Sequence, residues 1–181
     1  MQGINIFITS VLFCLPFIPN IRSGEEELVD WKASRKLSWS DYKANPDRGS
    51  GAAASTTTYL GIEYSIKDKT LSYKIQCSFS KDRSWGLNKT DYILAHEQGH
   101  FDIAEIFARK LNKELSEYSF NTSSCKKDLQ EIYERIVKEK EDMQNAYDRE
   151  TNHSIKKDKQ TEWLKKIAAL LDEYAAYTNY D

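Results

Sequence analysis

Thr90 to Tyr118 reads TDYILAHEQGHFDIAEIFARKLNKELSEY, and this stretch decides the fold. Its apolar residues recur at intervals of three and four, which is the spacing of one face of an α-helix. Thr90 can cap such a helix, and Asp91 adds a negative charge to its first turn. We therefore expect a long helix from this point onward, with one face turned towards a core. The apolar face comprises Ile93, Ile103, Ala104, Phe107, Leu111, Leu115 and Tyr118.

His96-Glu97-Gln98-Gly99-His100 lies within this helix and has the pattern H-E-x-x-H. A spacing of four residues brings His96 and His100 onto one helix face, where both ring nitrogens can reach a single metal ion. Glu97 lies about 100° further round the helix, which is where a general base acting on water should be. The alternative is two ordinary imidazoles on an amphipathic helix, which would leave a buried Glu97 without a partner. The pattern favours zinc.

A catalytic zinc ion has three protein ligands and keeps its fourth position for water. The chain contains three histidines, so the remaining imidazole is that of His153. His153 lies in a stretch, residues 147–154, that we expect to be a break between helices, where a loop can direct a side chain back at the first helix. Asp148 and Glu150 share that stretch and are the competing ligands, because carboxylates also bind zinc.

The residues before this helix alternate with the period of two that is typical of β-strands. Residues 53–66 are rich in Thr, Tyr and Ile, and Thr70 to Phe79 alternates apolar with polar side chains. Lys67-Asp68-Lys69 separates the two segments as a turn, so they predict an antiparallel hairpin. Further upstream, Lys36 to Tyr42 alternates weakly and predicts a short strand, and Asn45 to Gly51 has the composition of a loop.

Two further helices are predicted downstream. One opens at Ser123 or Ser124, the other begins at about Lys156, and both have apolar residues on one side. The fold class is therefore α+β, with a small N-terminal antiparallel β-sheet followed by three long α-helices. Residues 25–181 are enough for a single domain with a real core, but not comfortably for two domains.

Residues 1–24 have the composition of a secretory signal peptide. Ile6 to Ile18 is almost wholly apolar, and acidic residues follow at 25–27. A stretch of this length is short for a membrane span, which needs about 20 residues, and matches the core of a signal peptide. An uncleaved anchor is the alternative, because Met1 to Asn5 contains no Lys or Arg. We expect a secreted or periplasmic protein with no membrane span once the leader is removed.

The composition indicates a folded protein that does not bind nucleic acid. Charged residues make up 30% of the chain, but the formal net charge is only −2, so no basic excess exists to neutralise phosphates. Removal of the leader leaves Cys77 and Cys125. An oxidising compartment would allow a disulfide between them, and two buried free thiols are equally compatible with the sequence.

The run from His96 to Glu105 resembles the active-site helix of a family of secreted bacterial proteins. Members have no established function and are usually described as zinc-dependent proteases. The resemblance includes Leu37-Ser38-Trp39-Ser40-Asp41-Tyr42 upstream, and Tyr147-Asp148-Arg149-Glu150-Thr151-Asn152-His153 downstream is similar to a tyrosine-aspartate … threonine-x-histidine element. The resemblance implies a zincin-like metal helix and supports His153 as a ligand. It also implies a glycine after that histidine, where this chain has Ser154.

These features together predict an exported zinc metallohydrolase, most simply a peptidase. Zinc held by His96, His100 and His153 would activate a water molecule. Glu97 would take the proton of that water and later return it to the leaving group. Tyr147 would help to stabilise the oxyanion, and the alternative for this residue is packing, which is the more common role of a tyrosine that closes a helix.

The substrate is expected to be a peptide or protein. It would lie along an exposed strand such as residues 70–79, by addition of a strand to the sheet. The alternative is a zinc-stabilised binding or assembly protein of the cell envelope, without catalysis. In that case Glu97 would be dispensable and metal removal would unfold the domain.

Overall fold

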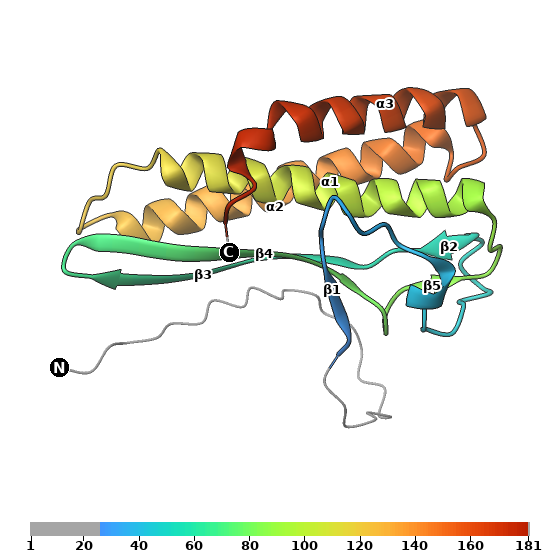
Figure 1. The fold of residues 1–181 in the computed structure, drawn as a ribbon, viewed down its shortest axis with the longest axis horizontal. Helices are drawn as coiled ribbons and strands as arrows, with labels where there is room; N and C mark the ends of the chain where they lie inside the picture. The colour runs from blue at the N-terminus through green and yellow to red at the C-terminus, as the bar shows by residue number, and fades with distance from the viewer. Residues whose placement is uncertain (1–25, 181) are drawn as a thin grey trace.

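The structure is a computed structural model that describes residues 26–180, so the expected signal peptide lies outside the described residues. An antiparallel sheet is followed by three long helices, which confirms the α+β fold class. Figure 1 shows all three helices on one face of the sheet, with α1 directly over the long hairpin and α3 furthest from it. The helices are α1 (Asp91–Ser116), α2 (Cys125–Thr151) and α3 (Lys157–Glu173).

The main sheet is built on the predicted hairpin. Strands β3 (Thr58–Lys67) and β4 (Thr70–Ser80) pair antiparallel along their whole length, from Thr58 opposite Phe79 to Lys67 opposite Thr70. The turn consists of Asp68 and Lys69, both with positive φ, which is the geometry of a tight two-residue hairpin turn. Two very short strands, β2 (Ala54–Ser55) and β5 (Trp85–Gly86), form a second small sheet at one end of the molecule (Figure 1).

Strand β4 lies in the centre of the main sheet, between β3 and β1 (Leu28–Asp30). Beyond β1, the backbone carbonyl of Cys77 accepts from Trp31, and the backbone N–H of Ile75 donates to Tyr180. The edge of β4 from residue 75 to residue 80 is therefore occupied. The prediction that residues 70–79 offer an exposed strand for a substrate is therefore wrong for residues 75–79, whose edge is covered by pairing partners, whereas residues 70–74 have none on this edge among the described residues.

The segment Lys36 to Tyr42 is not the short strand that its alternation predicted. It contains a 3-10 helix, η1 (Trp39–Asp41), preceded by an extended Ser38. The Asp41 carboxylate accepts hydrogen bonds from the Ser38 backbone N–H at 2.9 Å and from the Ser38 hydroxyl at 3.0 Å. These local bonds of a carboxylate to the backbone compete with strand formation.

Helix α1 is the central element of the molecule and contacts both other helices as well as β2, β3 and β4. It starts where the sequence predicted: the Thr90 hydroxyl accepts from the backbone N–H of Ile93 at 3.2 Å. Its predicted apolar side is buried from Ile103 to Leu115, with Ile103, Ala104 and Leu111 fully inaccessible, and is half-buried at Ile93 and Tyr118. At roughly 25 cal/mol per Å² of apolar surface, burial of this helix is a major part of the stability.

A second, polar side of α1 is also buried, except at the half-buried Gln98, and we refer to its residues as the polar stripe. They follow one another at intervals of four and three: Gln98, Asp102, Glu105, Arg109 and Asn112. Each holds a segment distant in the chain. Asp102 accepts from the Trp31 indole N–H at 2.7 Å, Glu105 accepts from the Tyr180 hydroxyl, and Asn112 donates to the carbonyl of Tyr177 at 3.0 Å.

Helix α2 begins after Ser124, as predicted, but continues further than the sequence indicated. Residues 147–151 were expected to lie in a break between helices, and this is wrong, because they form the last turn and more of α2. The break starts at Asn152, whose left-handed backbone ends the helix. Helix α3 then begins at Lys157, one residue from the predicted start.

Cys77 and Cys125 are free, buried thiols. Burial raises the pKa of both, and it does so most strongly for Cys77. The disulfide that an oxidising compartment would allow is not formed.

None of the helices within residues 26–180 has the length and apolar character needed to span a membrane.

Candidate metal centre

Three ligand atoms from two helices meet at one point. His96 and His100 project from α1, and Asp148 projects from the last turns of α2. The Nε2 atoms of His96 and His100 each lie 3.1 Å from Oδ1 of Asp148, and 3.3 Å from each other. Among the described residues this is the group of His, Cys, Asp and Glu side chains whose ligand atoms lie close enough together to hold a metal ion.

Asp148 and His100 shift each other's pKa. Burial acts to raise the pKa of Asp148, but hydrogen bonds to His100 and His96 outweigh burial and hold this pKa well below its ordinary value. Burial acts to lower the pKa of His100, and the Asp148 carboxylate reverses this effect, so that the pKa of His100 is raised. Asp148 is therefore an anion at neutral pH beside two imidazoles, which is the charge that a bound cation would need.

The two imidazoles are held in different ways. The Nδ1 of His100 is hydrogen-bonded to the side-chain oxygen of Gln144, whose amide N–H in turn donates to the His100 carbonyl at 2.9 Å. This pair of bonds fixes the ring with its Nε2 towards Asp148. The Nδ1 of His96 is buried and has no hydrogen-bond partner among the described residues. His96 is held instead by its ring, which stacks on Tyr147 with centroids 4.4 Å apart.

Tyr147 lies behind the histidines and does not line the hollow described below. It is fully buried, and its hydroxyl donates to the backbone carbonyl of His96 at 3.3 Å. It also meets the ring of His100 edge-on, with centroids 5.0 Å apart. The residue proposed for oxyanion stabilisation thus has its hydroxyl engaged with α1, and its ring packs both imidazoles.

Glu97 is buried beside the ligand pair and faces the same space. Its Oε2 accepts a hydrogen bond from the hydroxyl of Thr56 at 2.6 Å, and that hydroxyl lies 2.9 Å from the Tyr42 hydroxyl. Among the described residues Oε1 of Glu97 has no hydrogen-bond partner. One oxygen of this carboxylate is therefore anchored, and the other is available to a water molecule or substrate.

A hollow of about 530 Å³ gives access to these groups. This volume is within the range of small-molecule and peptide sites. One wall is the continuous segment from Ala52 to Thr58, which is made only of Ala, Ser and Thr. The opposite wall is α2, from Lys140 to Asp148, and His96, Glu97 and His100 line the hollow between them.

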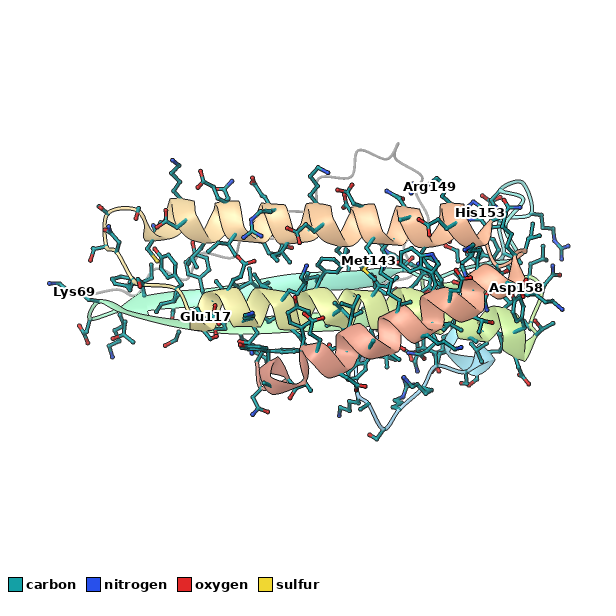
Figure 2. The ribbon with its side chains drawn as sticks, turned by 90° about the horizontal axis from the view of Figure 1, so that it is seen from above. Lys69, Glu117, Met143, Arg149, His153 and Asp158 are labelled. Carbon is teal, nitrogen blue, oxygen red and sulfur yellow. The ribbon has the colours of Figure 1, made fainter. Side chains whose placement is uncertain are left out.

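His153 lies at the rim of this hollow and outside the three-ligand group. Its side chain is 68% exposed, and its Nδ1 is 3.6 Å from Oδ1 of Asp148. Figure 2 shows His153 at the end of α2, beyond Arg149 and at the opposite end of the molecule from Lys69 and Glu117. Glu150, the other competing ligand, accepts from the Trp163 indole N–H at 2.8 Å and is not in the group.

The chemistry of the donor set fits zinc. Two imidazole nitrogens and a carboxylate oxygen are ligands that zinc takes in catalytic sites with a fourth position open. They converge on one point. Among the described residues no Lys or Arg lies within ion-pair distance of Asp148. A histidine that binds a metal through Nε2 carries its proton on Nδ1. The Nδ1 of His100 is hydrogen-bonded to Gln144, as is usual for metal-binding histidines, whereas the buried Nδ1 of His96 has no acceptor among the described residues.

Sequence reasoning missed Gln144 and Thr56, and gave Asp148 only as a competitor. A signal existed for Gln144 and Asp148, because their spacing of four places them on one side of a helix once α2 is continued to Thr151. No local signal pointed to Thr56, which lies 41 residues from Glu97 and reaches it through the fold.

The fold and the site together define an α+β protein with a candidate metal centre between two helices. The chain belongs to the bacterial family described as "Bacterial protein of unknown function (DUF922)", which it matches over residues 19–154. The matched range includes the hairpin, α1, α2 and every residue of the candidate centre. No curated protein matches the chain, and no solved structure does.

Proposed function

We propose that this protein is an exported zinc-dependent hydrolase, most simply a peptidase. One observation carries the proposal: the buried Glu97 carboxylate faces the same hollow as the convergent atoms of His96, His100 and Asp148. A purely structural metal site has no need of a carboxylate that is adjacent to its ligands and open on one oxygen. The H-E-x-x-H pattern on a helix adds the expectation of zinc.

His96, His100 and Asp148 would hold the ion, and His153 is placed to contact Asp148 from the rim. When bound, zinc would supply a Lewis acid that makes water a competent nucleophile near neutral pH. Glu97 would take the proton of that water on Oε1 and return it to the leaving group. Thr56 would keep the carboxylate aimed at the hollow through its bond to Oε2, and Tyr147 would fix the histidine rings from behind.

A peptide substrate is supported by the shape of the hollow. Its wall from Ala52 to Thr58 has no long side chain, so an extended main chain can approach closely. This wall leads directly into β3, whose outer edge pairs with no other strand of the described residues, and the Leu60 carbonyl of β3 accepts from the Tyr133 hydroxyl at 2.7 Å. A substrate strand could therefore be added here rather than along β4.

The test combines zinc content with hydrolysis. We expect the protein without its leader to bind one zinc ion per chain and to cleave a fluorescence-quenched general protein substrate. Glu97→Gln should keep zinc but lose activity by about 10²-fold or more, since a general base contributes at least this factor. Glu134→Gln, which removes an exposed carboxylate of α2, is the matched control and should behave like the wild type.

Wild-type protein that binds no zinc would refute the proposed centre. Equal hydrolysis by the wild type and Glu97→Gln would remove Glu97 from the mechanism.

A second function has an observation of its own: the ligands come from two helices, so an ion would cross-link α1 to α2. A zinc-stabilised protein without catalysis would bind zinc, resist unfolding and show no Glu97-dependent cleavage.

A further inference from the structure

The hollow extends along α2 beyond the metal ligands. Asp148, Gln144 and Lys140 follow one another at intervals of four, so they lie on one side of the helix, and all three line the hollow. At 1.5 Å per residue, Lys140 lies about 12 Å along the helix axis from Asp148. The end of the hollow distant from the candidate centre is therefore marked by a lysine.

Lys140 is half-buried and has no ion-pair or hydrogen-bond partner among the described residues. Two exposed lysines of α2 are paired: Lys127 reaches Glu131 at 3.5 Å and Lys138 reaches Asp142 at 2.5 Å, each one turn further along the helix. Lys126 has no such partner among the described residues, but unlike Lys140 it is exposed. Burial is the largest influence on the pKa of Lys140 and lowers it, while Glu141, which also lines the hollow, and Cys77 act to raise it. A partly desolvated ammonium group without a partner is costly, and an incoming anion would offset that cost.

We propose that Lys140 binds a carboxylate of the substrate and makes the protein selective for acidic peptides. An extended chain advances about 3.3 Å per residue, so the distance of about 12 Å corresponds to three or four residues from the site of cleavage. The carboxylate would be an Asp or Glu side chain, or the terminal carboxylate of a short peptide. The opposite wall of small residues leaves room for the chain between Lys140 and the candidate centre.

This inference uses the proposed function to place the cleaved bond, but carboxylate binding can be measured without catalysis. The experiment is fluorescence anisotropy with the Glu97→Gln protein loaded with zinc, so that no peptide is consumed. A series of labelled neutral peptides carries one Glu moved along the sequence, each paired with the same peptide carrying Gln. A second series compares free with amidated C-termini and thereby separates a side-chain carboxylate from a terminal one.

We expect one Glu position, or the free terminus, to tighten binding about tenfold relative to its neutral counterpart. Lys140→Met should abolish the difference, and Lys140→Glu should favour a Lys-bearing peptide at the same position. Lys138→Met is the control: Lys138 is exposed on the same helix and does not line the hollow, so this variant should keep the preference.

Three results would overturn the inference: equal binding of the acidic and neutral peptides by the Glu97→Gln protein with Lys140 intact, no binding of either series, or an unchanged preference after Lys140→Met. These outcomes are separate from those that decide the proposed function. A preference that depends on Lys140 in a protein that hydrolyses nothing would leave Lys140 as a carboxylate site and refute only the hydrolase. Hydrolysis without such a preference would support the hydrolase and refute only the assignment of Lys140 as a carboxylate site.

Discussion

Gly99 is the residue that allows the two ligand helices to approach each other. A Cβ atom at this position would lie 2.7 Å from the hydroxyl of Tyr147 and 3.0 Å from two of its ring carbons. The ring cannot easily move away, because it is fully buried and stacks on His96. Gly99, between the two histidines, is thus required by packing against α2 rather than by its backbone conformation.

Gly99→Ala should therefore destabilise both the fold and the site. We expect the free energy of unfolding to fall by about 1–3 kcal/mol, which is the usual cost of an overpacked core. Zinc affinity should fall at least about tenfold, because displacement of Tyr147 moves the His96 ring, and ligand support of this kind is worth that factor. Urea unfolding and competitive zinc titration measure the two effects.

Gly61→Ala provides the control, since a Cβ atom there would meet only the Cβ of Gln76, at an ordinary 3.9 Å. That variant should bind zinc as the wild type does. If Gly99→Ala were as stable as the wild type with the same zinc affinity, the close packing of Tyr147 on α1 could not be what holds the histidines.

At the residue scale, the relative positions of side chains that lie on one helix could be predicted from the sequence. His96, Glu97 and His100 could be placed relative to one another because helical geometry alone relates them. The partner of Glu97 could not be predicted, because Thr56 reaches it only after the hairpin has folded against α1. The same holds for Tyr42, which follows Thr56 in that chain of hydrogen bonds.

At the element scale, the end of α2 has an unusual backbone. Asn152, His153 and Ser154 all have positive φ, of 50°, 50° and 69°. The Tyr92 hydroxyl donates to the Ser154 carbonyl at 2.8 Å and holds this turn against α1. A left-handed conformation costs a residue with a Cβ atom roughly 1–2 kcal/mol. This cost is the physical reason for the glycine that the family resemblance leads us to expect at position 154, where this chain has serine.

Ser154→Gly should accordingly stabilise the protein. The relief of left-handed strain exceeds the greater entropy that glycine has in the unfolded chain, and we expect a net gain of about 0.5–1 kcal/mol. Thermal and urea unfolding report this gain directly. Ser65→Gly, in the regular strand β3, is the matched control and should have the opposite sign. A destabilised Ser154→Gly variant would show that the serine side chain contributes more than the strain costs.

Elements with a strong period were predictable, and those set by local side-chain bonds were not. The hairpin and the three helix starts followed from period and caps. The 3-10 helix at Trp39–Asp41 depends on one carboxylate bonded to the Ser38 backbone, which weak alternation concealed. The length of α2 was underestimated because its last turn is polar on the outside, although Tyr147 and Thr151 are buried on the inside.

At the scale of the whole molecule, a bound ion would join α1 to α2 at the end of the molecule where the second small sheet lies (Figure 1). We expect zinc at 100 times its dissociation constant to raise the free energy of unfolding by about 2.7 kcal/mol. Chelation should lower the melting temperature without unfolding the protein, since α1 remains packed on the sheet through its apolar side. Melting curves by circular dichroism, with and without chelator, measure this.

Variants of the two candidate third ligands sharpen the same experiment. Asp148→Ala should abolish the zinc-dependent increase in melting temperature, whereas His153→Ala should retain most of it, because His153 is exposed and lies outside the three-ligand group. The reverse result would identify His153 as the third ligand. A metal-free protein that is wholly unfolded would favour the zinc-stabilised, non-catalytic function.

The polar stripe of α1 also constrains when this protein can fold during its synthesis. Glu105 and Asn112 are buried, yet their partners are Tyr180 and Tyr177, about 65 to 75 residues later in the chain. Until those tyrosines have left the ribosome, burial would leave the Asn112 amide N–H without its acceptor, at a cost of about 1–3 kcal/mol, and would leave the Glu105 carboxylate with Arg109 as its partner. The helix that carries both histidines is therefore expected to reach its final position on a nascent chain only after residues 177–180 have left the ribosome.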